Sequence, residues 1–201
     1  MNIRFPDFFR PFFGKLVWRK DASSKVIYLT FDDGPVPEVT SQVLDILDQF
    51  NIKGTFFCVG DNVRKYPEVY ARIVESGHKP GNHTFNHIKG FSVKVDEYVD
   101  NALKALAYIN SNLFRPPYGR ITRKQKQKLE SRFEIIMWDL LTHDYNKRLS
   151  PEKILQNIKR FSRNGSIVVF HDSVKASDNI LSVLPAAIEF WRSEGYEFAT
   201  L

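Results

Sequence analysis

Two adjacent carboxylates, Asp32 and Asp33, follow the alternating apolar residues 25–31, and a Gly-Pro pair comes directly after them. Residues 25–31 are rich in β-branched and aromatic side chains, which predicts a buried strand that ends at the two aspartates. Because consecutive side chains of a strand point to opposite sides, we expect different tasks: one aspartate binds a metal ion and the other moves a proton. The alternative is an Asp-Asp-Gly turn without chemistry.

Two histidines, His83 and His87, complete a candidate metal site. Their spacing places two imidazoles on one side of a helical turn, close enough to share a divalent ion, and imidazole is a good zinc ligand. The spacing alone is weak evidence for a metal site, since many surface histidines have it. With Asp33 as third ligand, two imidazoles and one carboxylate leave coordination positions open for water and substrate.

Four short motifs follow one another along the chain: residues 30–34 (TFDDG), 83–87 (HTFNH), 115–119 (RPPYG) and 169–172 (VFHD). Together they resemble the motifs of the polysaccharide deacetylase family, the NodB-homology carbohydrate esterases. The resemblance extends from about residue 25 to residue 201, and four motifs in the family's order are far more specific than any one. It implies an α/β fold, a distorted (β/α) barrel with seven parallel strands.

The resemblance also implies a mechanism. In the family a metal ion holds the attacking water and polarises the amide carbonyl, an aspartate takes the proton of the water, and a histidine protonates the leaving amine. Carried over to this chain, Asp33, His83 and His87 bind the metal, Asp32 is the base and His171 is the acid. Imidazole titrates near neutrality and can donate to an amine. The alternative for His171 is a hydrogen-bonded residue at a strand end.

The third motif supplies the groups around this centre. Arg115 resembles the family arginine that pairs with the base aspartate and orients it, a task that suits the guanidinium fork. Two prolines then fix the backbone, so that by family analogy the amide of Tyr118 can donate to the oxyanion. The other residues expected in the substrate site are Pro117 and Val169.

One family motif, Asp-x-x-Asp-Trp, is changed here to residues 141–145 (LTHDY). Asp144 keeps the second aspartate, which in the family orients the acid histidine. Tyr145 replaces the tryptophan that walls the acetyl pocket, and Leu141 replaces the first carboxylate. The changes concern the substrate more than the chemistry, because an aromatic wall remains while the polar lining changes. His143 is expected either in the cleft or in an exposed loop.

The elements that position these residues alternate between strand and helix. Strands that alternate with helices, with motifs at strand ends, predict a parallel barrel or a doubly wound sheet with its site at the carboxyl rim. The family resemblance favours the barrel. His78, after the expected helix end at Gly77, is interpreted as a helix-end cation. The predicted strands are residues 25–31, 55–59, 113–115, 133–138, 166–170 and 196–201. Apolar stripes predict helices at 39–50 and 95–109 and from Pro67, Ser150 and Ile180 onward, and residues 122–131 are predicted to form a polar, lysine-rich helix on the outer surface.

Composition narrows the class of protein. The 201 residues, 43% of them hydrophobic, indicate a globular domain at residues 25–201. The net charge of +6 is not gathered into a basic block, so no nucleic-acid partner is expected. The single cysteine, Cys58, excludes an internal disulfide and is interpreted as a buried strand residue. No signal peptide and no transmembrane segment is visible, which favours a cytoplasmic or peripheral membrane location.

Residues 1–24 form an aromatic N-terminal extension. Its phenylalanines recur with the spacing of one helical face, although two prolines argue against an unbroken helix. We favour a latch packed on the domain over an anchor in a membrane interface, because aromatic stripes are more often core than anchor. The phenylalanines are Phe5, Phe8, Phe9, Phe12 and Phe13.

The sequence therefore predicts a metal-dependent N-deacetylase that acts on an N-acetylated amino sugar in a glycan or glycan precursor, of chitooligosaccharide or peptidoglycan type. Zinc is the expected ion, and the same ligands accept cobalt or manganese. One alternative keeps the fold and the metal site but cleaves an O-acetyl ester or a cyclic imide. Another is a non-catalytic glycan-binding module, which would have lost a ligand or Asp32, and neither is lost. A membrane-associated partner protein would rest on the aromatic N-terminus alone.

Overall fold

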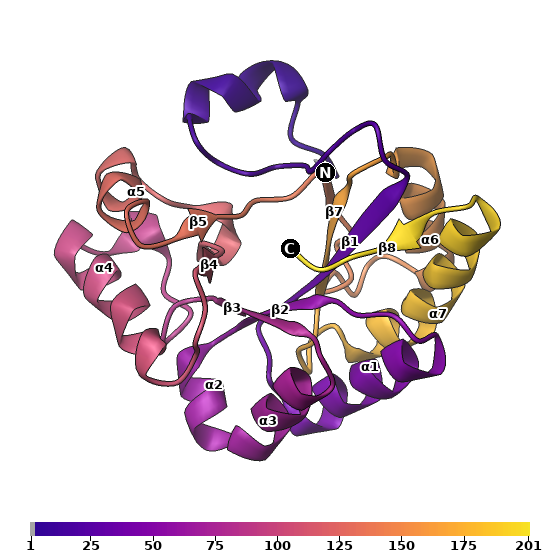
Figure 1. Ribbon diagram of the computed structural model, residues 1–201, viewed down its shortest axis with the longest axis horizontal. Coiled ribbons are helices and arrows are strands. Elements are labelled where there is room, and N and C mark those ends of the chain that lie inside the picture. Colours follow the sequence, from indigo (N-terminus) through magenta and orange to yellow (C-terminus); the bar gives the residue numbers. More distant parts are fainter. Residues whose placement is uncertain (1–2) are drawn as a thin grey trace.

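The computed structural model describes residues 3–201, and its central feature is a curved sheet with helices on its outer side (Figure 1). The strands follow the order β5-β4-β3-β2-β1-β7-β6, all neighbours are parallel, and β8 lies beside the first part of β1. The predicted seven-stranded parallel sheet is confirmed, with a short eighth strand added. The strands are β1 (Val26–Asp32), β2 (Thr55–Cys58), β3 (Lys79–Asn82), β4 (Leu113–Phe114), β5 (Glu134–Ile135), β6 (Leu140–Leu141), β7 (Ile167–His171) and β8 (Glu197–Phe198).

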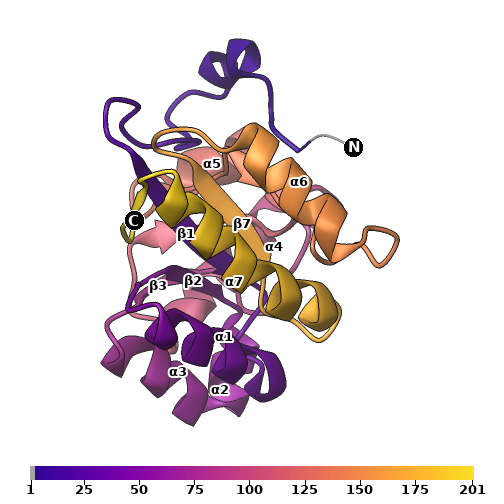
Figure 2. The ribbon, with the colours of Figure 1, turned by 90° about the vertical axis from the view of Figure 1, so that its right-hand side faces the viewer.

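Every α-helix of residues 3–201 except α2 agrees with a helix predicted from the sequence, and α1, α6 and α7 pack together on one side of the sheet (Figure 2). Ser150 caps α6 as predicted, because its hydroxyl accepts a hydrogen bond from the amide of Lys153 at 3.3 Å. Pro185 lies inside the last helix, α7. The helices are α1 (Pro37–Gln49), α2 (Gly60–Lys65), α3 (Pro67–Glu75), α4 (Val95–Lys104), α5 (Arg123–Leu129), α6 (Pro151–Phe161) and α7 (Ser177–Ser193).

Three short elements, α2, β3 and β6, were not predicted. The sequence of β3 is KPGN, which has no apolar alternation. It becomes a strand because its backbone pairs in parallel with β2, from Thr55 opposite Lys79 to Cys58 opposite Asn82. A strand of two residues such as β6 is likewise formed by pairing with its neighbour, and its own sequence contains no period.

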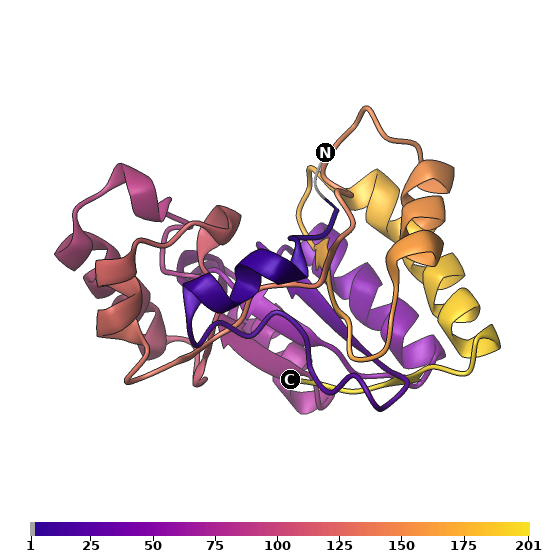
Figure 3. The ribbon, with the colours of Figure 1, turned by 90° about the horizontal axis from the view of Figure 1, so that it is seen from above.

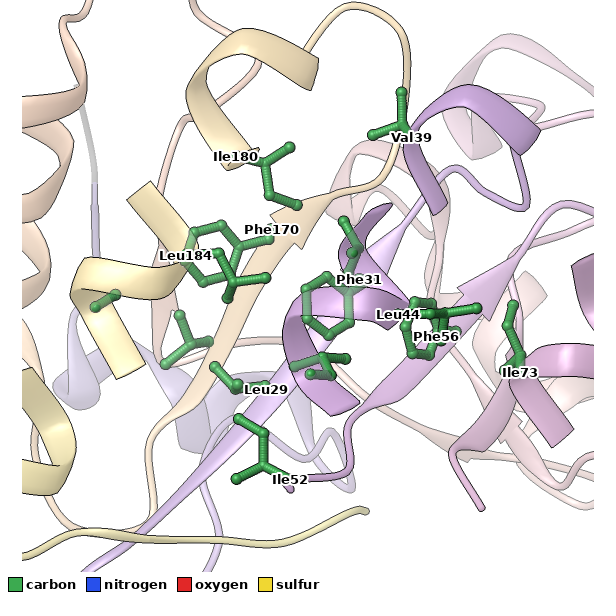
Figure 4. Close-up of a cluster of buried hydrophobic side chains, with 14 of the residues drawn as sticks. Leu29, Phe31, Val39, Leu44, Ile52, Phe56, Ile73, Phe170, Ile180 and Leu184 are labelled. Atoms are coloured by element: carbon green, nitrogen blue, oxygen red, sulfur yellow. The ribbon is translucent and has the colours of Figure 1, made fainter. Parts of the chain in front are cut away.

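The main core fills the space between β1, β2 and β7 and the helices outside them (Figure 4). Phe31 is fully buried, and its ring stacks on Phe56 at 4.7 Å and on Phe170 at 6.1 Å between centroids. Each large apolar side chain buried in this way contributes about 1.5–3 kcal/mol to stability. Cys58 is buried beside them, as predicted. This packing holds the central strands, and so fixes the positions of their carboxyl ends.

The sheet does not close by direct pairing of its edge strands, and the N-terminal extension occupies the gap. Val17 forms a parallel bridge with Ile136, directly after β5, and Arg19 forms an antiparallel bridge with Ser166, directly before β7. Figure 3 shows the extension between the two sides of the sheet. Residues that the sequence assigns to the extension therefore take part in hydrogen bonding with the barrel.

The aromatic part of the extension is a 3-10 helix, η1 (Asp7–Phe13), without a buried residue. Phe5 stacks on Trp18 at 4.7 Å and attaches this part to the barrel. Phe8 and Phe12 are 74% and 77% exposed. The contacts agree with a latch, and the exposed rings leave the membrane anchor as a hypothesis. No helix in residues 3–201 is long and apolar enough to span a bilayer.

A buried ionic network fastens the extension to the amino end of β7. Asp139 is fully buried, and both of its carboxylate oxygens accept hydrogen bonds. One oxygen accepts from Arg10 at 2.8 Å, and both accept from Arg163, at 2.9 and 2.5 Å. Ser166 donates a further bond at 2.8 Å, and Asp7 of the extension pairs with Arg163 at 2.7 Å. Neither Asp139 nor its partners had been assigned a role from the sequence.

His78 corrects a sequence interpretation. It does not act as a cation at the end of α3, because it is 4% exposed and its Nδ1 accepts a hydrogen bond from the amide of Gly54 at 3.1 Å. Burial lowers the pKa of His78 to about 4, so the ring is neutral at pH 7. Its role is to pack beside Phe56, whose ring lies 5.2 Å away.

Candidate active site

Most of the predicted site residues line a single cavity of about 570 Å³ at the carboxyl ends of the strands. Three others lie just outside it: Arg115 and Asp144 are fully buried behind the lining, and Pro117 is buried at the start of η4 (Pro117–Gly119). Leu141, one of the two departures from the family pattern, also lines the cavity. The predicted residues in the lining are Asp32, Asp33, His83, His87, Tyr118, Tyr145, Val169 and His171.

Asp32 ends β1 and is held by a buried arginine. Its Oδ1 accepts a hydrogen bond from Arg115 at 2.7 Å, and no residue of 3–201 donates to its Oδ2. The guanidinium also donates to Thr30 at 2.7 Å and to the carbonyl of Met137 at 2.9 Å, and lies 4.1 Å from the ring centroid of Phe57. The arginine therefore fixes the aspartate through one oxygen and leaves the other free at the cavity.

Asp33 turns away from the strand, which brings both carboxylates to one cavity. Its φ is 84°, a backbone conformation that residues other than glycine rarely adopt. The turn is held by Asp172, which accepts hydrogen bonds from the amide of Gly34 at 3.1 Å and from Thr40 at 2.7 Å. A Cβ on Gly34 would overlap with the Asp172 carboxylate, which explains the glycine of the first motif. Burial raises the pKa of Asp172 to about 8.

Asp33, His83 and His87 form a cluster that can hold a metal ion. Oδ1 of Asp33 lies 3.1 Å from Nε2 of His87 and 3.7 Å from Nε2 of His83. Ligands of a tetrahedral zinc ion at about 2.0–2.1 Å lie about 3.3 Å apart, so the three side chains fit. The Nδ1 of His83 lies 2.7 Å from the carbonyl of Arg115, so it carries the proton and Nε2 presents its lone pair.

The charges of these ligands also suit a metal ion. Burial lowers the pKa of His83 to about 4, so its imidazole is neutral at pH 7, as a ligand must be. Burial raises the pKa of Asp33, but the hydrogen bond to His87 and the charges of His171 and His83 outweigh it, and the pKa falls well below its usual range. A neutral imidazole and an ionised carboxylate therefore face the same point.

The two histidines do not lie on a helical turn, and that prediction was wrong. The positive φ values of Thr84 and His87, 63° and 54°, interrupt the helical repeat. Side chains hold the loop: Asn82 accepts from the amide of Thr84 at 2.8 Å, and Asn101 accepts from the amide of Phe85 at 2.9 Å. The loop brings the two imidazoles to 5.0 Å between ring centroids, so the ligand pair survives without the helix.

His171 ends β7 on the other side of the cavity and is held by Asp144. The carboxylate accepts from Nδ1 of His171 at 2.7 Å and from its backbone amide, also at 2.7 Å. Burial lowers the pKa of His171, but the charge and the hydrogen bond of Asp144 outweigh it, and the pKa rises to about 9. The imidazolium is therefore stable at pH 7 and can donate a proton from Nε2 into the cavity.

Aromatic side chains form the walls. Tyr145 packs edge to face on the ring of His171 at 4.8 Å, and Tyr118 packs on that of His87, also at 4.8 Å. Tyr118 has a φ of 60°, which turns the chain after the two prolines. His143 is 6% exposed and lies 3.0 Å from the hydroxyl of Tyr145, so it belongs neither to an exposed loop nor to the cavity lining.

Several residues of the lining were not predicted. Trp138 had not been assigned to the site, although it lies shortly after β5. The others lie in loops whose sequences contain no motif, so only the fold reveals them. These residues are Lys89, Arg120, Ser173 and Lys175.

Comparison with known proteins decides the family. A sequence profile described as Polysaccharide deacetylase matches residues 19–132. The chain belongs to the polysaccharide deacetylase family. The matched region contains the first three motifs, and the fourth, VFHD, lies beyond it. The resemblance inferred from the motifs is confirmed.

Curated members of the family include bacterial cell-wall enzymes. A peptidoglycan-N-acetylglucosamine deacetylase of Bacillus cereus is 36% identical over 87% of this chain and 66% of its own length. A second Bacillus cereus protein with the same name is 29% identical, over 94% and 92%. The peptidoglycan-N-acetylmuramic acid deacetylase PdaC of Bacillus subtilis is 31% identical, over 90% of this chain and 39% of its own. The chain thus spans just under two thirds of the first relative and under half of PdaC.

Solved structures of the family share the fold. The Bc1960 peptidoglycan N-acetylglucosamine deacetylase has a TM-score of 0.90 and 31% identity, over 98% of this chain and 95% of that chain. A CE4 family pseudoenzyme from Bacillus anthracis has a TM-score of 0.83 and 25% identity, over 92% and 67%. The first confirms the predicted fold. The second shows that the fold is found without activity, so function must be argued from the residues of the site.

Proposed function

We propose that the protein is a metal-dependent hydrolase that removes acetyl groups from N-acetylated amino sugars of a glycan, with peptidoglycan-type strands as the first substrate to test. One observation carries the proposal: a carboxylate with a free oxygen, an imidazolium and a set of three possible metal ligands face one cavity. The names of the peptidoglycan deacetylases among the relatives support the choice of substrate.

The residues divide the reaction between two sides of the cavity. Asp32 accepts the proton of the attacking water through Oδ2, while Arg115 keeps its other oxygen in place. His171 gives its proton to the sugar nitrogen as the carbon–nitrogen bond breaks, and Asp144 holds the imidazolium in position. Acetate and the free amine leave. The backbone amide of Tyr118 is proposed, by family analogy, to donate to the oxyanion.

Asp33, His83 and His87 would hold the ion. When bound, a divalent ion lowers the pKa of water and polarises the acetyl carbonyl. Two imidazoles and one carboxylate favour zinc, and cobalt or manganese fits the same donors. The neutral ring of His83 and the ionised Asp33 need no change of protonation to bind it at pH 7.

The test is acetate release from N-acetylated oligosaccharides of chitin and peptidoglycan type by purified protein supplied with zinc, cobalt or manganese. We expect acetate and free amine in equal amounts, and release about 10²- to 10⁴-fold slower from an Asp32→Asn variant that stays folded. An O-acetylated xylooligosaccharide and a cyclic imide serve as competing substrates. Acetate release from the ester, or ring opening of the imide, with no acetate from the amino sugars, would refute the proposed bond and keep the metal site.

A further inference from the structure

Three cationic side chains, Lys89, Arg120 and Lys175, line the same cavity as the metal-site residues. They come from three separate loops, after β3, after η4 and after β7. Arg120 and Lys175 are exposed and Lys89 is half-buried, so their charges lie at the mouth of the cavity and not at its floor. A glycan that brings an acetamido group to the floor must pass these charges.

The two lysines are placed by the aromatic walls. Nζ of Lys89 lies 5.6 Å from the ring centroid of Tyr118, and Nζ of Lys175 lies 5.3 Å from that of Tyr145. An ammonium within about 6 Å of a ring centroid is attracted to the negative face of the ring. Since each ring also packs on a histidine of the site, one lysine stands on either side of the reacting groups.

The cavity contains no acidic partner for these cations. Asp32 and Asp33 are the only carboxylates of residues 3–201 in the lining, and both are engaged within the site. None of the three cations forms an ion pair within residues 3–201. Lys128, on the surface of α5, shows the contrast, because it pairs with Asp96 at 2.5 Å.

We propose that Lys89, Arg120 and Lys175 form an anion-binding rim, and that the preferred substrate is an N-acetylated glycan with a carboxylate or phosphate on or next to the acetylated sugar. The proposal deepens the proposed deacetylase function and rests on it for the reaction, but not for binding. Like charges around a cleft focus their field and raise the local concentration of an oppositely charged ligand. The effect falls with ionic strength, because exposed charges are screened.

Two oligosaccharides with the same backbone provide the test: one with the free lactyl carboxylate of N-acetylmuramic acid, and one with that carboxylate converted to a neutral amide. At low ionic strength we expect kcat/KM to be about 5- to 50-fold higher for the carboxylate, through a lower KM. Salt at about 0.5 M should remove most of the difference. A phosphorylated analogue tells whether phosphate serves as well. Equal kcat/KM for the charged and neutral forms at low salt would overturn the proposal.

Single substitutions test whether the residues of the rim cause the preference for the carboxylate substrate. Lys175→Ala and Lys89→Ala should each lower kcat/KM for the carboxylate form severalfold more than kcat/KM for the amide form, and Lys175→Arg should keep the preference. Lys128→Ala, which removes a surface lysine outside the cavity, is the matched control. A loss shared equally by the charged and the neutral substrate would contradict a charge-specific role.

Calorimetric binding to the Asp32→Asn protein separates this proposal from the deacetylase function. Tighter binding of the carboxylate form, without hydrolysis of any oligosaccharide by the wild type, would refute the deacetylase and keep the rim. Equal binding of the two forms would refute the rim whatever the turnover.

Discussion

Asp32 and Asp139 are both buried beside arginine, at opposite ends of the sheet, but their oxygens are used differently. Asp139 has both oxygens bonded, by Arg10, Arg163 and Ser166. Asp32 has one oxygen bonded to arginine and the other without a donor among residues 3–201, at the cavity. A carboxylate with both oxygens hydrogen-bonded stabilises the structure, whereas a carboxylate held through one oxygen can accept a proton on the other.

Asp32→Asn should have the largest effect on the reaction. We expect turnover to fall by about 10²- to 10⁴-fold, because the general base is lost while the amide oxygen can still accept from the arginine. Acetate release measures the rate, and circular dichroism with metal analysis checks that fold and ion are retained. Asp139→Asn is the matched control, with near-native turnover in its folded fraction. Near-native turnover of the Asp32→Asn protein would show that Asp32 is not the general base.

Asp139→Asn should have the largest effect on stability. Breaking a fully buried ion pair costs about 3–5 kcal/mol, and we expect about 2–4 kcal/mol here because Arg163 is partly exposed and keeps some hydration. Urea unfolding gives the free energy, with Asp32→Asn measured beside it. A loss below about 1 kcal/mol would show that the network contributes little to the attachment of the extension.

The pH dependence tests the second carboxylate of the site. Because Asp144 holds the pKa of His171 at about 9, the acid stays protonated up to that pH, and kcat/KM falls as pH rises through it. In Asp144→Asn the pKa should return toward 6.5, moving the basic limb down by about 1–2 pH units. A pH profile of acetate release measures it. If the basic limb of the pH profile does not move in Asp144→Asn, His171 is not the general acid.

Tyr145→Ala should have the smallest effect, on the choice of acyl group. The ring packs on His171 in the cavity, so its removal makes space beside the acetyl position. Each methylene then buried is worth about 0.8 kcal/mol, or about a fourfold rise in propionyl over acetyl and in butyryl over propionyl. Tyr196→Ala, outside the cavity, is the control. Unchanged ratios would place the acyl wall elsewhere.

The sequence predicted the site better than the elements that form it. Asp33, His83 and His87 meet as predicted although their loop is not helical. The ligands were predicted from their residue types, and hydrogen bonds of Asn82 and Asn101 hold the loop in a shape that brings them together. Strands as short as β6 carry no period, so pairing alone reveals them.

Long-range partners outside the family motifs could not be predicted from the sequence. Asp139 meets Arg10 and Arg163 from distant parts of the chain, and no local pattern links them. The same holds for Lys89 and Lys175, which face one cavity only after the barrel forms. Where a family motif existed, as for Arg115 and Asp144, the partner was found in advance.

Parallel measurement of bound metal and acetate release tests the central claim most directly. Protein stripped with a chelator is titrated with zinc, and both the ion content per chain and the rate on an N-acetylated oligosaccharide are followed. We predict that both rise together and level off near one ion per chain, and that Asp33→Ala stays folded but retains no ion and no activity. Acetate release at full rate by folded protein that holds no metal would contradict the account.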